Sequence, residues 1–223
     1  MKLKWKLAIS INAIFLVLLC VIGFFAYSQI MNLIDLTVED ELQNSSSLGL
    51  ALFEARYPGA WAEKDGKLLK GTSVLNDDNT IVDIITNETG IVSTIFLGDT
   101  RIATSITDDQ GNRITGTKAN PEVVETVLVK GENYKGATTI NGKLYNTLYI
   151  PIRDESGKII GMWFVGTDYD NLKQIQKSSK TEILIACGVI LIIGICYAMT
   201  VGNITGNSLN KLMDDIGVIS SGN

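Results

Sequence analysis

Two uninterrupted apolar stretches dominate the pattern of hydrophobic and polar positions along the chain. Residues 7–30 (LAISINAIFLVLLCVIGFFAYSQI) and residues 183–201 (ILIACGVILIIGICYAMTV) contain no charged side chain. A helix needs roughly 20 apolar residues to cross a bilayer core about 30 Å thick, so both stretches are predicted to span a membrane. The first stretch is longer than the apolar core of a signal peptide, and no clear cleavage pattern follows it. We therefore favour an uncleaved anchor over a signal peptide.

The charges next to the first stretch predict the orientation of both spans. Lys2, Lys4 and Lys6 precede it, and flanking Lys or Arg favours the cytoplasmic side. Two spans then return the C-terminus to the cytoplasm of a cell-membrane protein. The expected organisation is a cytoplasmic tail at 1–6, spans at 7–30 and 183–201, an extracellular domain at 31–181 and a cytoplasmic helix at 202–223.

The region between the spans combines a long helix with alternating strands. Met31 to Tyr57 has leucines at helical spacings and stops at Pro58-Gly59, a typical helix end. From Trp61 onward, apolar and polar residues alternate between turns rich in Gly, Asp and Asn. Asn141-Gly142 between two such runs is a strong hairpin signal. The class is therefore α+β, with a mostly antiparallel sheet of five or six strands.

Individual elements can be placed from the same pattern. We expect a hairpin at 61–71, helices at 79–88, 122–130 and 170–182, and strands at 91–96, 100–106, 113–117, 134–140, 143–152 and 158–167. After the second span, Ile and Leu recur at heptad-like spacings, which predicts a short amphipathic helix.

Composition argues against several classes of function. The net charge is −5 and no basic cluster occurs, so no nucleic-acid partner is expected. The chain has no histidine, the commonest general base and metal ligand. Cys20, Cys187 and Cys196 all lie in the predicted spans, which argues against a disulfide framework in the outer domain. Hydrolase and nucleotide-binding motifs are missing, and we expect no enzymatic activity, metal or cofactor.

Three longer motifs together resemble a known family. They are TGIVSTIFLGDTRIATSI, GTKANPEVVETVLVKGENYKG and NGKLYNTLYIPIRDESGKIIGMWFVGT. This combination is similar to the single-Cache sensor domain of bacterial methyl-accepting chemotaxis proteins, notably those of Clostridium-like Gram-positive bacteria. The resemblance covers residues 61–167 well and implies a PAS-like Cache fold between the two spans.

The last residues resemble the first helix of a HAMP linker. The segment 204–209 follows that pattern with Ser208 where a proline usually stands, and Gly222-Asn223 lies where the helix would end. The connector and the second HAMP helix are missing from the sequence. The chain is therefore either a fragment or a natural truncation, and the sequence leaves both open.

The resemblance also implies a pocket for a small molecule, commonly a carboxylate or an amino acid. Arg101 offers a planar fork of donors that suits a carboxylate. The further candidate ligand contacts are the hydroxyl groups of Thr104, Tyr134, Tyr145 and Tyr149, and the carboxylate of Asp168, which would accept an amino group.

Each candidate also has a purely structural interpretation. Arg101 could instead pair with Asp99 or Asp83 at the surface, and the tyrosines could be half-buried sheet residues. In a regular strand Thr104 lies on the opposite face from Arg101. The two converge only if a β-bulge lies between them.

Two functional hypotheses follow. In the first, the chain is a chemoreceptor-type sensor, expected from the resemblance to form a homodimer. It binds an extracellular solute and signals through the second span to the HAMP-like helix. In the second, the chain is a membrane-anchored interaction or heterodimerisation module without a solute ligand. The two differ at the pocket, because only a sensor loses a ligand response when Arg101 is replaced.

Overall fold

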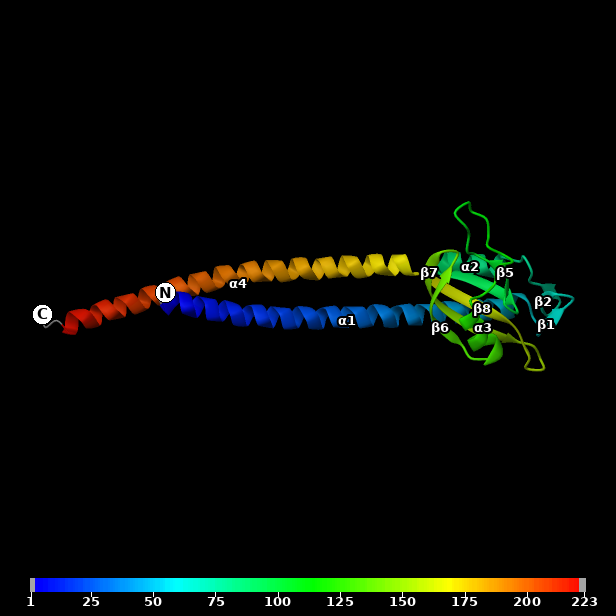
Figure 1. Cartoon of the computed structure of the whole chain (residues 1–223), viewed down its shortest axis with the longest axis horizontal. Coiled ribbons are helices and arrows are strands. Elements are labelled where there is room, and N and C mark those ends of the chain that lie inside the picture. The colour runs from blue at the N-terminus through cyan, green and yellow to red at the C-terminus, as the bar shows by residue number, and fades with distance from the viewer. Residues whose placement is uncertain (1–2, 221–223) are drawn as a thin grey trace. The chain divides into compact units, whose positions relative to one another are not determined.

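Two long helices, two antiparallel sheets and three short helical segments make up the described chain (Figure 1). The computed structural model describes residues 3–220, including their side chains except those of residues 3–9, 11–12, 170–177, 179, 205–207 and 209–220. The chain divides into a folded domain, Asp35–Gln174, and a helical unit made of Met1–Ile34 and Ile175–Asn223.

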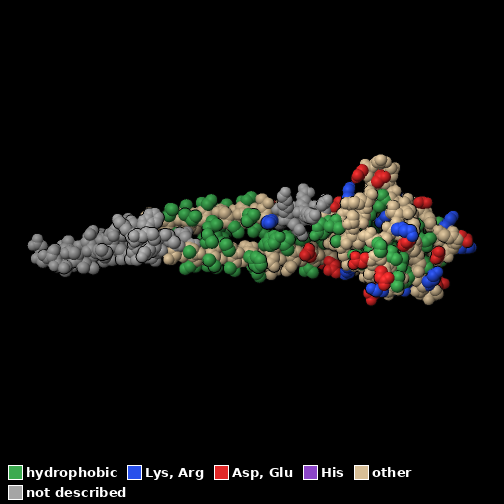
Figure 2. All heavy atoms as spheres, in the orientation of Figure 1, with side chains coloured by type: hydrophobic (Ala, Val, Ile, Leu, Met, Phe, Trp, Pro, Cys, Tyr) green, Lys and Arg blue, Asp and Glu red, His purple; other side chains and the backbone are tan. Residues whose placement is uncertain are grey.

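The helical unit contains the two predicted spans, which belong to α1 (Leu3–Arg56) and α4 (Tyr169–Ser220). Within the described residues, Ala13–Arg56 and Lys180–Ile204 are long and apolar enough to cross a membrane. Figure 2 shows hydrophobic side chains along both helices, many of them exposed. Such surfaces suit lipid better than water. The prediction of two membrane-capable helices is confirmed, while the exact boundaries of the spans stay predictions.

The ends of these helices agree with the sequence as far as the structure describes them. Helix α1 ends at Arg56, just before Pro58-Gly59. The backbone of α4 stays helical to Ser220, so the predicted tail helix is present. The side chains of residues 209–220 and the HAMP-like Gly222-Asn223 lie outside the description.

The folded domain contains a five-stranded sheet and a smaller three-stranded sheet, both antiparallel. The larger sheet has the order β5-β4-β8-β7-β6. Its strands are β4 (Val92–Leu97), β5 (Thr100–Thr104), β6 (Tyr134–Ile140), β7 (Lys143–Arg153) and β8 (Ile159–Asp168). The smaller sheet consists of β1 (Trp61–Lys64), β2 (Lys67–Lys70) and β3 (Ser73–Val74).

The turn residues explain why the predicted hairpins form. Asp65-Gly66 joins β1 to β2 and Asn141-Gly142 joins β6 to β7. All four residues have positive φ, between 48° and 77°. Asn, Asp and Gly adopt this conformation at lower cost than other residues. Both predicted hairpins are confirmed.

The predicted strand at 113–117 is wrong. Around this segment the structure has an isolated bridge between Thr107 and Arg113 and no continuous ladder. The Gly116 amide and the Thr117 carbonyl instead bond to the backbone of Arg101, at 2.8 and 2.9 Å. The alternating pattern therefore reflects a segment that follows the edge of β5 and pairs with it only locally.

Helices α1 and α2 (Thr80–Thr89) cover one face of the larger sheet. The Phe53 ring of α1 lies 5.3 Å from the Trp163 ring of β8, centroid to centroid. The Ser93 hydroxyl of β4 donates to the Val82 carbonyl of α2 at 3.1 Å. Trp163 is fully buried, and this face forms a tightly packed core.

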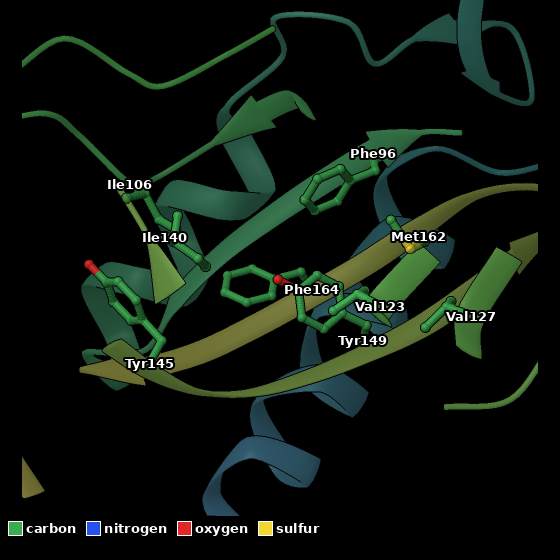
Figure 3. Packing of buried hydrophobic residues seen from close by; sticks show 9 residues of the cluster. All are labelled: Phe96, Ile106, Val123, Val127, Ile140, Tyr145, Tyr149, Met162 and Phe164. Carbon is green, nitrogen blue, oxygen red and sulfur yellow. The ribbon is translucent and has the colours of Figure 1, made fainter. Parts of the chain in front are cut away.

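A second core cluster lies on the opposite face of the sheet (Figure 3). Helix α3 (Pro121–Val124) and the π-helix η1 (Glu125–Val129) cover it. The sequence predicted one helix here, and the structure confirms a helical segment that changes to π-helical after its first turn. The cluster consists of Phe96, Ile106, Val123, Val127, Ile140, Tyr145, Tyr149, Met162 and Phe164.

A β-bulge in β5 decides which face Arg101 occupies. The register between β4 and β5 shifts so that Ile102 is an extra residue on β5. The Ile102 carbonyl accepts a hydrogen bond from the Asp77 amide at 2.9 Å. As a consequence, Arg101 and Thr104 lie on the same sheet face as Phe96. This is the condition under which the two candidate residues were expected to converge.

Gly49 of α1 packs on Trp163 with no room for a side chain. A β-carbon at Gly49 would lie 2.4 Å from Trp163 Cζ2. We expect Gly49→Ala to lower the free energy of unfolding by about 1–3 kcal/mol through overpacking, although alanine favours an exposed helix position by about 1 kcal/mol. Tryptophan fluorescence during thermal unfolding of the full chain in detergent measures this effect.

Ser47→Ala is the matched control for this substitution, because Ser47 is exposed on the same helix. Its midpoint should stay close to that of the wild type. A Gly49→Ala midpoint equal to or above the wild-type value would contradict the tight packing of α1 on Trp163.

Candidate functional site

Arg101 is a buried cation with little compensation from the protein. The residue is 3% exposed, and no carboxylate in the described part of the chain pairs with it. Its Nη1 donates to the Thr117 hydroxyl, while Nε has no hydrogen-bond partner among the described residues. The guanidinium carbon lies 4.9 Å from the centroid of the Phe96 ring, so a cation–π contact offsets part of the lost hydration.

Burial has an electrostatic cost at this position. It lowers the pKa of Arg101, and the nearby Tyr149 and Tyr145 oppose this shift. Because an arginine does not lose its proton in proteins, the folded domain holds a desolvated charge, at a cost on the order of a few kcal/mol.

The surface ion-pair interpretation of Arg101 is wrong. Asp99 pairs with Lys118 at 2.9 Å, and Asp83 pairs with Arg113 at 2.8 Å. Both aspartates therefore have other cationic partners. The Lys118 ammonium, followed by the Thr100 hydroxyl, lowers the pKa of Asp99.

The segment that follows the edge of β5 brings further polar groups to Arg101. Besides the bonds to Arg101 itself, the Ala119 amide donates to the Asp99 carbonyl at 2.9 Å. Asn120 is the N-cap of α3, with Pro121 in the first turn, where proline needs no amide hydrogen. The segment is thus fixed between an edge strand and a helix start.

A cavity of about 200 Å³ lies beside Arg101. At about 30 Å³ for each water, this is roughly the volume of six or seven water molecules. It is smaller than the usual site for a drug-sized ligand. Three parts of the fold form its walls: β5, the segment 114–120, and the β6–β7 hairpin with Tyr149. The lining residues are Arg101, Ile114, Thr117, Lys118, Ala119, Asn120, Thr139, Ile140, Asn141 and Tyr149.

Of the hydroxyl residues that were predicted to contact a ligand, Tyr149 lines this cavity. Its ring lies 4.7 Å from Phe164 and 6.0 Å from Phe96, centroid to centroid. Burial is the main cause that raises the pKa of Tyr149. The hydroxyl therefore stays protonated at neutral pH and can donate a hydrogen bond to a bound anion.

Thr104 shares a sheet face with Arg101 but does not line the cavity. Its hydroxyl lies 2.6 Å from the Thr94 hydroxyl and accepts from the Ile106 amide at 3.1 Å. Thr104 is fully buried, so these contacts satisfy a core hydroxyl. Its assignment as a ligand contact stays a prediction.

The other candidates also lie outside the cavity lining. Tyr134 packs edge-on against Tyr149, with ring centroids 6.0 Å apart. Tyr145 lies at one end of the core cluster, away from Val127 (Figure 3). Asp168 is the cross-strand partner of Tyr145 and the last residue of β8. The structure therefore brings Arg101 and Tyr149 to the cavity. Tyr134, Tyr145 and Asp168 do not line it.

Sequence reasoning missed several lining residues, chiefly Thr117, Asn120 and Asn141. Asn120 indicated a helix start and Asn141 indicated a turn, so each already had a backbone role. The signal that could have drawn attention to them is Thr117 near Asn120 and Thr139 near Asn141, because neither the cap nor the turn requires these threonines.

The observed fold agrees with the protein family that the sequence matches. Residues 73–179 match the family described as Single cache domain 3. The fold is that of a Cache domain. Its long N-terminal helix, antiparallel sheet and final helix confirm the PAS-like α+β prediction. No curated protein matches the sequence significantly.

Solved structures similar to this Cache domain include three bacterial sensor regions. The E. coli DcuS sensor domain is 18% identical, covering 45% of this chain and 72% of that one, with a TM-score of 0.35. The periplasmic sensory domain of the Campylobacter jejuni chemoreceptor Tlp1 is 16% identical, covering 67% and 59%, with a TM-score of 0.38. A sensory box sensor histidine kinase from Vibrio cholerae is 14% identical, covering 41% and 88%, with a TM-score of 0.28. These likenesses are distant, and the family match carries the fold assignment.

The unpaired charge predicts an unusual effect of replacing Arg101 in the ligand-free Cache domain. We expect Arg101→Met to leave the thermal midpoint of the dialysed full chain unchanged or to raise it, because it removes a buried charge without a counter-ion and keeps an apolar stem. Differential scanning fluorimetry in detergent is the measurement.

Arg113→Met is the contrasting variant. Arg113 bonds both carboxylate oxygens of Asp83 and the Thr104 carbonyl, so its loss should lower the midpoint. A clear drop for Arg101→Met, as large as that for Arg113→Met, would mean that the protein already compensates the Arg101 charge.

Proposed function

We propose that the chain is a two-span membrane sensor whose extracellular Cache domain binds a small molecule through a carboxylate group. One observation carries this proposal: Arg101 is buried beside a cavity and has no carboxylate partner in the described part of the chain. A ligand carboxylate would supply the missing counter-charge and accept a hydrogen bond from the unpartnered Nε.

The chemistry of the two predicted residues at the cavity supports carboxylate binding. A guanidinium presents two neighbouring N–H groups that match the two oxygens of one carboxylate. The Phe96 ring beneath the Arg101 guanidinium restricts its orientation. Tyr149 adds a neutral hydroxyl donor at the same cavity. These groups bind and orient an anion, and we propose no enzymatic step, metal or cofactor.

The membrane arrangement and the output are proposed on the sequence and the family resemblance. The lysines before the first span favour cytoplasmic termini and an extracellular Cache domain. By resemblance to chemotaxis receptors, the second span would carry the signal to a HAMP-like helix at 202–223 in a homodimer. A ligand can drive this change only if it binds one conformation of the domain more tightly than the other.

A short electrostatic path supports coupling between Arg101 and the start of α4. Burial is the main cause that raises the pKa of Tyr145, Asp168 raises it further, and Arg101 lowers it. Tyr145 therefore lies within electrostatic reach of both residues. Asp168 immediately precedes α4, which begins at Tyr169. We propose that neutralising Arg101 with a carboxylate changes the Tyr145–Asp168 interaction and thereby the first turn of this helix.

The proposal predicts that small carboxylates stabilise the protein through Arg101. At about 100 times its dissociation constant, a ligand should stabilise the fold by about 2.7 kcal/mol, a shift of roughly 5–10 °C for a domain of this size. Thermal unfolding of the full chain in nanodiscs, against a panel of acetate, propionate, lactate, succinate and alanine, measures this shift.

Two Arg101 variants and one control sharpen this test. Arg101→Lys keeps the positive charge but loses the pair of neighbouring N–H donors. The dissociation constant of a carboxylate should therefore rise at least about tenfold. Arg101→Met should abolish the response, and Arg113→Lys, outside the cavity, should keep it. A response that persists in Arg101→Met would refute the proposed anchor. A flat panel would favour the membrane-anchored interaction module.

The coupling path gives a separate prediction for Asp168→Asn. This variant should bind a responsive carboxylate within about threefold of the wild type, because Asp168 does not line the cavity. It should, however, lose the ligand-induced change in amide hydrogen exchange over residues 169–182, measured by mass spectrometry on the full chain. Asp154→Asn, in an exposed turn, is the control. An unchanged exchange response in Asp168→Asn would remove Asp168 from the path.

A further inference from the structure

The other residues that line the cavity restrict which substituent the ligand can have next to its carboxylate. We infer that the cavity selects a short hydroxy- or oxo-carboxylate over the amino acid of the same skeleton, with Asn120 and Asn141 as the selecting residues. This inference rests on the carboxylate-sensing function proposed above.

The charges of the lining disfavour an amino group. Arg101 and Lys118 both line the cavity, and no lining residue is acidic. Asp99 neutralises Lys118 at 2.9 Å without lining the cavity itself. Asp168, the residue expected to accept an amino group, lies at the end of β8 and also outside the lining. An ammonium group beside the bound carboxylate would therefore find no anionic partner among the lining residues.

Two carboxamides line the same cavity with their hydrogen-bonding capacity uncommitted. Asn120 is the N-cap of α3 but makes no capping hydrogen bond, although asparagine at this position usually bonds an amide of the first turn. Asn141 is held at positive φ in the β6–β7 turn. Among the described residues, neither side chain has a hydrogen-bond partner in the protein. Both are thus available to a ligand.

A carboxamide fits a neutral polar group better than a cation in this setting. It carries one acceptor and two donors, so it can pair with a hydroxyl group or a carbonyl group. The cavity of about 200 Å³, roughly the volume of six or seven water molecules, favours a small ligand. Arg101 suits a carboxylate, and the two carboxamides suit a hydroxyl or carbonyl oxygen. Together they fit a short carboxylate with an oxygen substituent near the carboxyl group.

Matched pairs of acids test this selectivity with the full chain in nanodiscs. Isothermal titration compares glycolate with glycine, lactate with alanine and glycerate with serine, because each pair differs only in a hydroxyl or an ammonium group. We expect each hydroxy acid that binds to do so at least about tenfold more tightly than its amino acid. Propionate, which lacks the hydroxyl group of lactate, should bind more weakly than lactate.

A charge substitution at Asn120 provides the converse test. Asn120→Asp is nearly isosteric and keeps a good N-cap residue, but adds the anionic partner that the cavity lacks. The ratio of lactate to alanine affinity should shift at least about tenfold towards alanine. Asn87→Asp, exposed on α2 on the other side of the sheet, is the matched control and should leave the ratio unchanged. If Asn120→Asp does not fold, Asn141→Asp makes the same test in a turn that tolerates aspartate.

The outcomes separate this inference from the function on which it rests. Equal affinities for lactate and alanine, both lost in Arg101→Met, would overturn the selectivity and leave the carboxylate sensor intact. Tighter binding of alanine than of lactate to the wild type would also overturn it. Binding of no acid in either series, or binding that survives in Arg101→Met, would overturn both.

Discussion

A buried positive charge without a counter-ion among the described residues is the constraint around which the proposed ligand side of this domain is arranged. The face that carries Arg101 is otherwise a cluster of aromatic and aliphatic side chains. The protein compensates the charge with one hydroxyl group, one aromatic ring and two tyrosines whose pKa values are raised by burial. None of these groups is an anion at neutral pH. The charge of Arg101 thus lacks a counter-ion among the described residues, and this is the basis of the carboxylate site proposed above.

The two faces of the larger sheet differ in how closely they are packed, and the proposed site lies on only one of them. On one face, α1 and α2 pack so closely that Gly49 cannot carry a side chain against Trp163. On the other face, α3 and η1 pack against the core cluster, and the cavity lies beside Arg101 and Tyr149. A rigid face behind the strands holds Arg101 and Tyr149 in place. The other polar lining residues belong to the hairpin turn and the edge segment, where side chains can differ without disturbing the core.

Local chemistry made much of the fold predictable from the sequence. Asn-Gly and Asp-Gly turns fix hairpins because they tolerate positive φ, and Pro58-Gly59 fixes the end of α1. Long charge-free stretches indicate membrane spans without reference to the rest of the chain. Arg101 was recognisable as a candidate because its donors suit a carboxylate. Each of these signals lies within a few residues of the feature that it predicts.

Features set by distant pairing could not be predicted in the same way. The segment 113–117 alternates like a strand, but it pairs only locally, with the backbone of Arg101, Ile106 and Thr107. Asn120 and Asn141 line one cavity because an edge strand, a helix start and a hairpin turn meet there. The face of the sheet that Arg101 occupies depends on a bulge, and no local pattern in the sequence shows where a bulge lies.

That bulge makes the length of β5 as important as its composition. Ile102 is the extra residue that turns Arg101 to the cavity side while Ala103 stays opposite Ile95. A homologous chain with the same number of residues but no bulge would form a regular strand, with the guanidinium directed towards α2. A chain that lacked Ile102 would also form a regular strand, but its arginine would lie two residues before the threonine and stay on the cavity side. Among relatives, retention of the arginine therefore does not by itself indicate retention of the site. The number of residues that separate it from the following threonine has to be compared together with the strand pairing, because one residue in a regular strand or two residues with a bulge keep the arginine on the same face.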